Sequence, residues 1–166
     1  MLQKKICMLG SFAVGKTSLV RRYVDSIFSE NYVTTIGVKI DKKVLSVNNT
    51  DLGLILWDVY GEDNHQSVLP SYLRGMAAYI LVIDPSRPAT FVSAKKLHTL
   101  VLDTLGEKPF VLVLNKSDIK SEWKMDEDIF SELSGAAIAT IETSAKTDTG
   151  VDEVFQTLGI CFTKAA

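Results

Sequence analysis

The chain has few cysteines, no excess of charge of one sign and no long hydrophobic run. Two cysteines among 166 residues do not suggest a disulfide framework, and no cluster of Cys and His has metal-ligand spacing. The formal net charge of −2, with Lys and Arg spread along the chain, argues against nucleic acid as a principal partner, because a basic face would be expected. No run reaches the length of a membrane span and no signal peptide precedes the first apolar run, so a cytoplasmic protein is expected.

What is present is an alternation of apolar strands and helices, in a chain long enough for one domain over residues 1–166. Strands are expected at residues 4–9, 37–47, 52–57, 78–83, 110–114 and 137–143, and helices at residues 18–25, 89–105, 125–133 and from 151 onward. A turn at residues 48–51 makes the second and third strands a hairpin, and a short helix is expected near residues 65–72. The pattern predicts a three-layer α/β fold: a six-stranded, mostly parallel sheet with one antiparallel strand and helices on both faces.

Residues 10–17, Gly-Ser-Phe-Ala-Val-Gly-Lys-Thr, fit the phosphate-binding pattern G-x-x-x-x-G-K-[ST], with a strand before them and a helix after them. Glycine lets the backbone approach oxygen atoms closely, and successive N–H groups at a helix N-terminus suit a polyphosphate. Lys16 supplies a charge for the outer phosphates, and the Thr17 hydroxyl can ligate magnesium. The alternative for the bare pattern is a glycine turn before a helix. The expected phosphate-binding residues are Gly10, Ser11, Phe12, Ala13, Val14, Gly15, Lys16 and Thr17.

Asp58 follows the expected strand 52–57, and Gly61 comes three residues later. An acid at the carboxyl end of a strand beside a phosphate loop can hold magnesium through a water. Gly61 lacks a Cβ, so its N–H could approach a terminal phosphate closely. Alone, Asp58 is a weak signal because loops are rich in Asp; the adjacent phosphate loop makes it a candidate magnesium ligand.

Residues 115–118, Asn-Lys-Ser-Asp, follow the expected strand 110–114 and indicate which base is bound. The Asp118 carboxylate can accept hydrogen bonds from the N1–H and exocyclic amine of guanine, whereas adenine offers neither donor there. Charged hydrogen bonds contribute roughly 1.5–3 kcal/mol each, so such a site rejects adenine strongly. The apolar stem of Lys116 can lie across the base. The N–H of Ala145, within Ser144-Ala145-Lys146, could meet the guanine carbonyl; the alternative for an isolated Asn-x-x-Asp is a loop turn.

Together these motifs resemble the small GTPases of the Ras superfamily, most closely the Rab-like branch. The resemblance covers essentially the whole chain, with the motifs in the family's order and spacing. These motifs are the phosphate loop, Thr35-Ile36-Gly37, Trp57-Asp58-x-x-Gly61, Asn115-Lys116-x-Asp118 and Ser144-Ala145-Lys146. The resemblance implies a molecular switch that binds GTP or GDP with Mg²⁺ and hydrolyses GTP to GDP and phosphate. It also implies protein effectors, an exchange factor and an activating protein as partners.

The resemblance implies further roles for individual residues. Thr35 would bind magnesium and the γ-phosphate only in the GTP state, and Ser18 would contact an inner phosphate. Phe28 would pack against guanine, and Tyr32 would close over the phosphates. Residues 26–37 and 59–75 would be the two switch segments, ordered by the γ-phosphate and relaxed after hydrolysis. The residues expected to act in hydrolysis are Lys16, Thr35, Gly61 and Glu62.

Three departures from the family bear on mechanism. One is Val59-Tyr60, which replaces the usual Thr-Ala before Gly61 and could alter how the second switch moves. Glu62 stands where the family usually has glutamine, and an ionised carboxylate can only accept hydrogen bonds. It could polarise the attacking water but would face the phosphate charge; the alternative is an exposed carboxylate without a catalytic part. Phe12 stands where a small residue is usual, and its ring either crowds the catalytic space or turns outward. No arginine lies in the first switch segment, so slow intrinsic hydrolysis is predicted.

The C-terminal residues show no prenylation signal, so no lipid anchor is evident. A prokaryotic Ras-like GTPase, or a GTPase domain cut from a larger protein, also suits such a chain. A second hypothesis is a guanine-nucleotide-binding interaction module with negligible hydrolysis, suggested by Phe12 and Glu62. A third, a P-loop kinase, is disfavoured because no arginine-rich lid is evident and Asp118 selects guanine.

Overall fold

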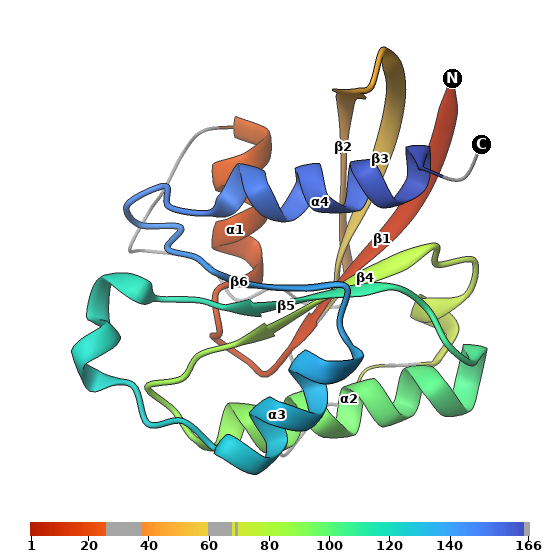
Figure 1. Ribbon diagram of the computed structural model, residues 1–166. Helices are drawn as coiled ribbons and strands as arrows, with labels where there is room; N and C mark the ends of the chain where they lie inside the picture. Colours follow the sequence, from red (N-terminus) through yellow and green to blue (C-terminus); the bar gives the residue numbers. More distant parts are fainter. Residues whose placement is uncertain (26–37, 60–67, 69, 165–166) are drawn as a thin grey trace.

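The computed structural model describes residues 1–25, 38–59, 68 and 70–164 (Figure 1). Its strands are β1 Leu2–Gly10, β2 Val38–Val47, β3 Thr50–Val59, β4 Ala78–Ile83, β5 Phe110–Leu114 and β6 Ala139–Glu142. Its α-helices are α1 Lys16–Asp25, α2 Ala89–Leu105, α3 Glu127–Ala136 and α4 Val151–Thr163, with short 3₁₀ helices η1 Pro70–Leu73 and η2 Ser117–Glu122. Within these described ranges, no helix has both the length and the apolar character needed to cross a bilayer.

The described strands form one six-stranded sheet in the order β2-β3-β1-β4-β5-β6. β1 pairs in parallel with β3 and β4, β4 with β5, and β5 with β6, whereas β2 runs antiparallel to β3. The predicted sheet is therefore confirmed. β4 and β5 are buried along their whole length, which explains why both read as continuous apolar runs whose bounds could be predicted.

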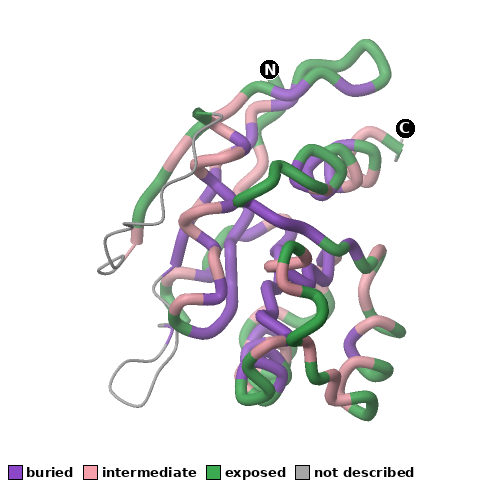
Figure 2. Tube along the Cα trace, turned by 90° about the vertical axis from the view of Figure 1, so that its left-hand side faces the viewer, coloured by how far each residue is buried: buried purple, intermediate pink, exposed green. Residues whose placement is uncertain are grey.

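The two faces of the sheet are covered by different helices. Successive side chains of a strand point to opposite faces, so Ile6 and Met8 join one core while Cys7 and Leu9 join the other. α1 and α4 pack on the first face, and α2 and α3 on the second (Figure 1). Figure 2 shows buried chain concentrated in the strands and on the inner sides of the helices, as a three-layer fold requires.

The β2–β3 hairpin is tighter than predicted. The expected turn at residues 48–51 is wrong in length, because only Asn48 and Asn49 leave the ladder, with φ angles of 52° and 61°. Two consecutive residues with positive φ form the type I′ geometry that matches strand twist, and asparagine tolerates it well. Thr50 and Asp51 consequently belong to β3, where they pair with Val47 and Ser46.

The helix predicted at residues 125–133 is displaced in the structure, because α3 runs from Glu127 to Ala136. Asp126 is its N-cap, and its carboxylate accepts a 3.1 Å hydrogen bond from the Ile129 N–H, which fixes where the helix begins. The following strand is shorter than expected, Ala139–Glu142. Of the short helix expected near residues 65–72, Pro70–Leu73 is a 3₁₀ helix, and residues 65–67 lie outside the described part of the chain.

Candidate nucleotide-binding site

The carboxyl ends of the parallel strands bring the predicted motifs to one edge of the sheet. The phosphate loop connects β1 to α1, Asp58 lies next to the last residue of β3, and Asn115 follows β5. Ser144 comes two residues after β6. Because parallel strands end at the same edge, motifs separated by up to about 130 residues lie together, where ligands of open α/β sheets bind.

Lys16 lies inside the phosphate loop. It is the first residue of α1 and is only 6% exposed. Its Nζ donates hydrogen bonds to the carbonyl oxygens of Gly10, at 3.1 Å, and Ser11, at 3.0 Å. Burial lowers the pKa of Lys16 to about 8, with Asp58 opposing the shift and Arg87 adding to it. An anion beside this ammonium would restore its ordinary protonation.

The two glycines of the loop are required by close protein contacts. A Cβ on Gly10 would lie 2.5 Å from the carbonyl oxygen of Val82 in β4. A Cβ on Gly15, whose φ is +106°, would overlap the side-chain amide of Asn115. Both glycines were predicted to let the backbone approach a phosphate; in addition, β4 and the residue after β5 lie too close to them for a side chain.

Thr17 and Asp58 meet beside the loop. The Thr17 Oγ1 donates a 2.5 Å hydrogen bond to Asp58 Oδ2, and Asp58 is only 1% exposed. A hydroxyl and a buried carboxylate are hard oxygen ligands of the kind magnesium takes, usually with one or two carboxylates and substrate phosphates. The pair therefore fits the predicted ion. Thr35, the third expected ligand, lies outside the described residues.

Asn115 joins the phosphate loop to the base motif. Its Nδ2 donates to the Val14 carbonyl at 2.9 Å, and its Oδ1 accepts from Thr143 Oγ1 at 2.9 Å. Asn115 is 2% exposed, so both bonds lie away from water. The side chain ties the loop after β1 to β5 and to the residue that follows β6.

Lys116 contacts the phosphate loop as well. With φ at 71°, it directs its Nζ to the Ala13 carbonyl, at 3.1 Å, and to Asp84 Oδ2, at 2.9 Å. The Trp123 Nε1 donates to the Lys116 carbonyl at 3.2 Å. The stem of Lys116, predicted to lie across the base, is thereby held at both ends.

Asp118 is oriented by the last predicted motif. Its Oδ1 accepts a 2.7 Å hydrogen bond from Ser144 Oγ, which itself accepts from the Thr147 N–H at 3.1 Å. A carboxylate has about four acceptor positions, so it can still accept from a base. Arg22 of α1 donates to the carbonyl oxygens of Ala145, at 2.8 Å, and Lys146, at 3.1 Å.

Asp84 and Arg87 were not among the predicted site residues. Asp84 is fully buried and lies between Lys116, at 2.9 Å, and Arg87, at 3.9 Å. Arg87 Nη1 donates to the carbonyl of Phe12 at 3.0 Å. An acid immediately after a buried parallel strand, the signal that identified Asp58, could have identified Asp84 too. The Phe12 side chain itself is 36% exposed.

Several predicted residues lie outside the described part of the chain. They are Phe28, Tyr32, Thr35, Gly61 and Glu62. The first switch segment, residues 26–37, lies entirely outside it, and of the second only residues 59, 68 and 70–75 are described.

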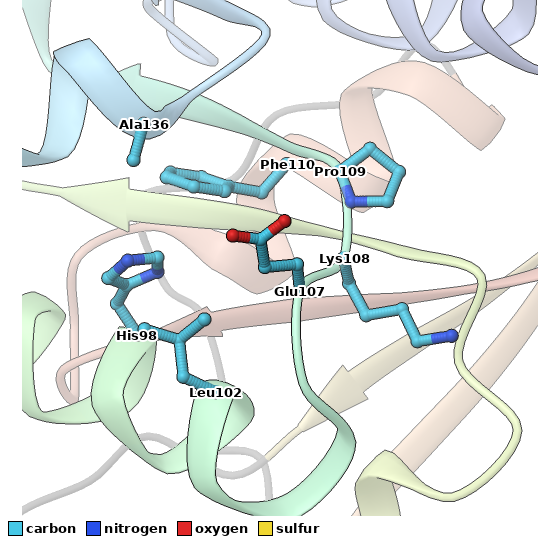
Figure 3. Close-up of a pocket in the computed structure, with 7 residues that line it drawn as sticks. All are labelled: His98, Leu102, Glu107, Lys108, Pro109, Phe110 and Ala136. Carbon is cyan, nitrogen blue, oxygen red and sulfur yellow. The ribbon is translucent and has the colours of Figure 1, made fainter.

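A separate cavity of about 490 Å³ opens near the amino ends of the parallel strands, beside the first residue of β5 (Figure 3). It is lined by His98, Leu102, Glu107, Lys108, Pro109, Phe110 and Ala136. Tyr79 and His98 are joined beside it by a 2.6 Å hydrogen bond between Tyr79 Oη and His98 Nδ1. None of the predicted site residues lines it.

A buried loop lysine, a Thr–Asp pair and a base motif at one sheet edge define a nucleotide-binding protein of the P-loop class. The sequence model of the Ras family matches residues 5–162, and the chain belongs to this family of small GTPases. It is 36% identical over 157 residues to Ras-related protein RABF2b of Arabidopsis thaliana, covering 93% of this chain and 78% of the relative. It is 33% identical over 155 residues to Ras-related protein SEC4 of Saccharomyces cerevisiae (93% and 72%) and 37% identical over 157 residues to Ras-related protein Rab-17 of Mus musculus (93% and 73%). The chain is therefore a Rab-like small GTPase, and a GTP-dependent molecular switch in general terms.

Proposed function

We propose that residues 1–166 form a single G domain that hydrolyses GTP slowly unless a partner accelerates it, and that signals in its GTP state. The observation that carries this proposal is the direct connection between the phosphate loop and the base motif. Asn115 and Lys116 donate to the carbonyls of Val14 and Ala13, so a guanine and its polyphosphate would bind one connected unit. A cytoplasmic location is part of the proposal.

Nucleotide binding is assigned to the residues that the sequence identified. Backbone N–H groups of the phosphate loop and the Lys16 ammonium bind the phosphates, because both present hydrogen-bond donors and positive charge at a helix N-terminus. Asp118, oriented by Ser144, selects guanine. The full set is Gly10, Ser11, Phe12, Ala13, Val14, Gly15, Lys16, Thr17, Ser18, Phe28, Tyr32, Asn115, Lys116, Asp118, Ser144, Ala145 and Lys146.

Magnesium would be held by Thr17, by Asp58 and, in the GTP state, by Thr35. When bound, the ion supplies positive charge to the outer phosphate oxygens. The Thr17–Asp58 hydrogen bond, with Asp58 buried, supports the first two assignments, because it holds two hard oxygen atoms together beside the loop.

Hydrolysis is assigned to Lys16, Thr35, Gly61 and Glu62. Lys16 stabilises charge on the outer phosphates, and the Gly61 N–H contacts the terminal one. Glu62 can accept a proton from water but cannot donate to the phosphate, which accounts for slow unaided turnover. None of these four residues is an arginine, and no arginine lies in the first switch segment, so Lys16 acts without an arginine finger from this chain.

The two switch segments, residues 26–37 and 59–75, are proposed to bind the effector and so transmit the signal. Contacts to the γ-phosphate order them for an effector, and hydrolysis releases those contacts. An exchange factor would restore GTP, and an activating protein would accelerate its loss.

The test is to extract and identify the nucleotide bound to purified protein, then to follow GTP-loaded protein through a single turnover. We expect guanine nucleotide, a requirement for magnesium and slow conversion of GTP to GDP. Bound adenine nucleotide, or equal competition by ATP, contradicts guanine binding. Rapid unaided cleavage contradicts the slow rate.

The alternative is a nucleotide-binding module with negligible hydrolysis. The aromatic residue Phe12 in the phosphate loop suggests it, because a ring that crowds the catalytic space can obstruct water or an activating arginine. GTP that persists on the protein through the single-turnover measurement would select this alternative.

A further inference from the structure

The carbonyl groups of the phosphate loop point to different cations. Those of Gly10 and Ser11 accept from Lys16 inside the loop. The carbonyl of Phe12 accepts from Arg87 Nη1 at 3.0 Å, and that of Ala13 accepts from Lys116 Nζ at 3.1 Å. In a trans peptide the N–H points opposite to the C=O, so the Ala13 N–H points away from Arg87.

Ala13 lies between these two held peptide groups. Its φ is 63°, in the left-handed region that a residue with a Cβ rarely adopts. Such a conformation persists only where its surroundings determine it. Arg87 fixes the peptide group before Ala13, and Lys116 fixes the peptide group after it. The two cations together therefore maintain the left-handed conformation of Ala13.

Asp84 couples the two cations. It is fully buried, and its Oδ2 lies 2.9 Å from Lys116 Nζ and 3.9 Å from Arg87 Nη1. The Arg87 N–H also donates to the Asp84 carbonyl at 2.9 Å, and Ser86 donates twice to Asp84 Oδ1. Arg87 is therefore anchored by its backbone, although its side chain is 44% exposed.

We propose that Arg87 is a positioning residue for the outer phosphates: it holds the Phe12–Ala13 peptide so that the Ala13 N–H faces the polyphosphate. This inference rests on the proposed guanine-nucleotide function. Arg87 acts through the Phe12 carbonyl, so its loss weakens binding of nucleotides that have a β-phosphate and leaves GMP unaffected.

The experiment measures affinities of GTP, GDP, GMP and ATP by competition against a fluorescent GDP, in the complete chain with magnesium. Arg87→Met should lower the affinities for GTP and GDP about tenfold, the scale of one charge-assisted hydrogen bond. It should change the affinity for GMP less than about twofold. Arg87→Lys keeps the charge but not the planar donor group and should lose about threefold for GDP. Lys95→Met, which removes an exposed charge from α2, the helix that follows Arg87, should change none of these affinities.

Each result bears on the proposal. A selective loss for GTP and GDP in either folded variant supports it. Unchanged GDP affinity in both variants, or a loss for GMP as large as that for GDP, overturns it, because a general packing role would affect all three nucleotides alike. If Arg87→Met does not fold, the ratio of GDP affinity to GMP affinity in Arg87→Lys decides between the positioning role and a general packing role. Failure of the unaltered protein to prefer GTP over ATP would instead contradict the proposed function.

Discussion

At the scale of single residues, Lys16 shows how burial and ligand charge act on one group. Burial lowers its pKa to about 8 in the protein without nucleotide. The folded chain therefore loses this proton before the unfolded chain does, and Lys16 makes folding more favourable as pH rises from about 8 towards 10.5. A bound polyphosphate favours the charged ammonium and reverses the shift.

Nucleotide binding should accordingly take up protons. Near pH 8, where half of the Lys16 side chains are neutral, binding of GDP should take up about half a proton, and more at pH 9 than at pH 7. Calorimetry in buffers of different ionisation enthalpy measures this uptake. Equal uptake at pH 7 and pH 9 would show that Lys16 stays charged in the empty site.

Phe12 and Glu62 are the residues at which slow hydrolysis can be tested. Phe12→Gly removes an exposed ring without removing the carbonyl that Arg87 contacts. Glu62→Gln supplies both a donor and an acceptor for water and phosphate. The double variant should raise the single-turnover rate of GTP cleavage about tenfold or more, the scale of one donor to the transition state.

Val92→Ala, which shortens an exposed apolar side chain on α2, is the matched control and should leave the rate unchanged. If the double variant hydrolyses GTP no faster than the unaltered chain, these positions do not limit the reaction.

At the scale of elements, the same substitution in two helices should have opposite effects. A Cβ on Gly159 of α4 would lie 2.7 Å from Val47 Cγ2 and 2.8 Å from Leu45 Cδ2, whereas none of the described atoms lies within 4 Å of a Cβ on Gly135 of α3. Gly159→Ala should destabilise the protein by about 1–3 kcal/mol through overpacking against β2. Gly135→Ala should stabilise it by about 0.5–1 kcal/mol, because alanine loses less backbone entropy in a helix.

Urea denaturation of the two variants measures both differences in the free energy of unfolding. A stability gain in Gly159→Ala would mean that α4 and β2 separate readily, contrary to their close packing.

Elements also show what the sequence could predict. The runs 78–83 and 110–114 gave correct strands because a strand buried on both faces is apolar throughout. The start of α3 was misplaced because Asp126, a cap, was interpreted as part of the helix. The turn at Asn48 and Asn49 was predicted too long because Thr50 and Asp51, two polar residues at the start of β3, resemble a loop.

At the scale of the whole molecule, the site combines local and distant contacts, and only the local ones leave a pattern in the sequence. The phosphate loop and the residues 115–118 are contiguous motifs, so both were identified. The contact of Arg87 with Phe12 joins residues 75 positions apart and depends on the packing of α2 beside β4. No periodicity records such a contact, which is why Arg87 was missed. Asp84 was missed although it follows a buried strand, as a local signal would require.

Magnesium removal should affect the whole protein through Asp58. Nucleotide at 100 times its dissociation constant adds about 2.7 kcal/mol to folding stability, and the ion increases this term by tightening nucleotide binding. Chelation by EDTA should therefore lower the melting temperature and speed GDP release.

In Asp58→Asn, which weakens the ligand set beside Thr17, release should already be fast and EDTA should add little. Asp51→Asn, at an exposed position of the hairpin, is the control and should respond to EDTA like the unaltered chain. Because Asp58 lies on β3 and Thr17 on α1, a full EDTA response in Asp58→Asn would mean that the ion is held without β3.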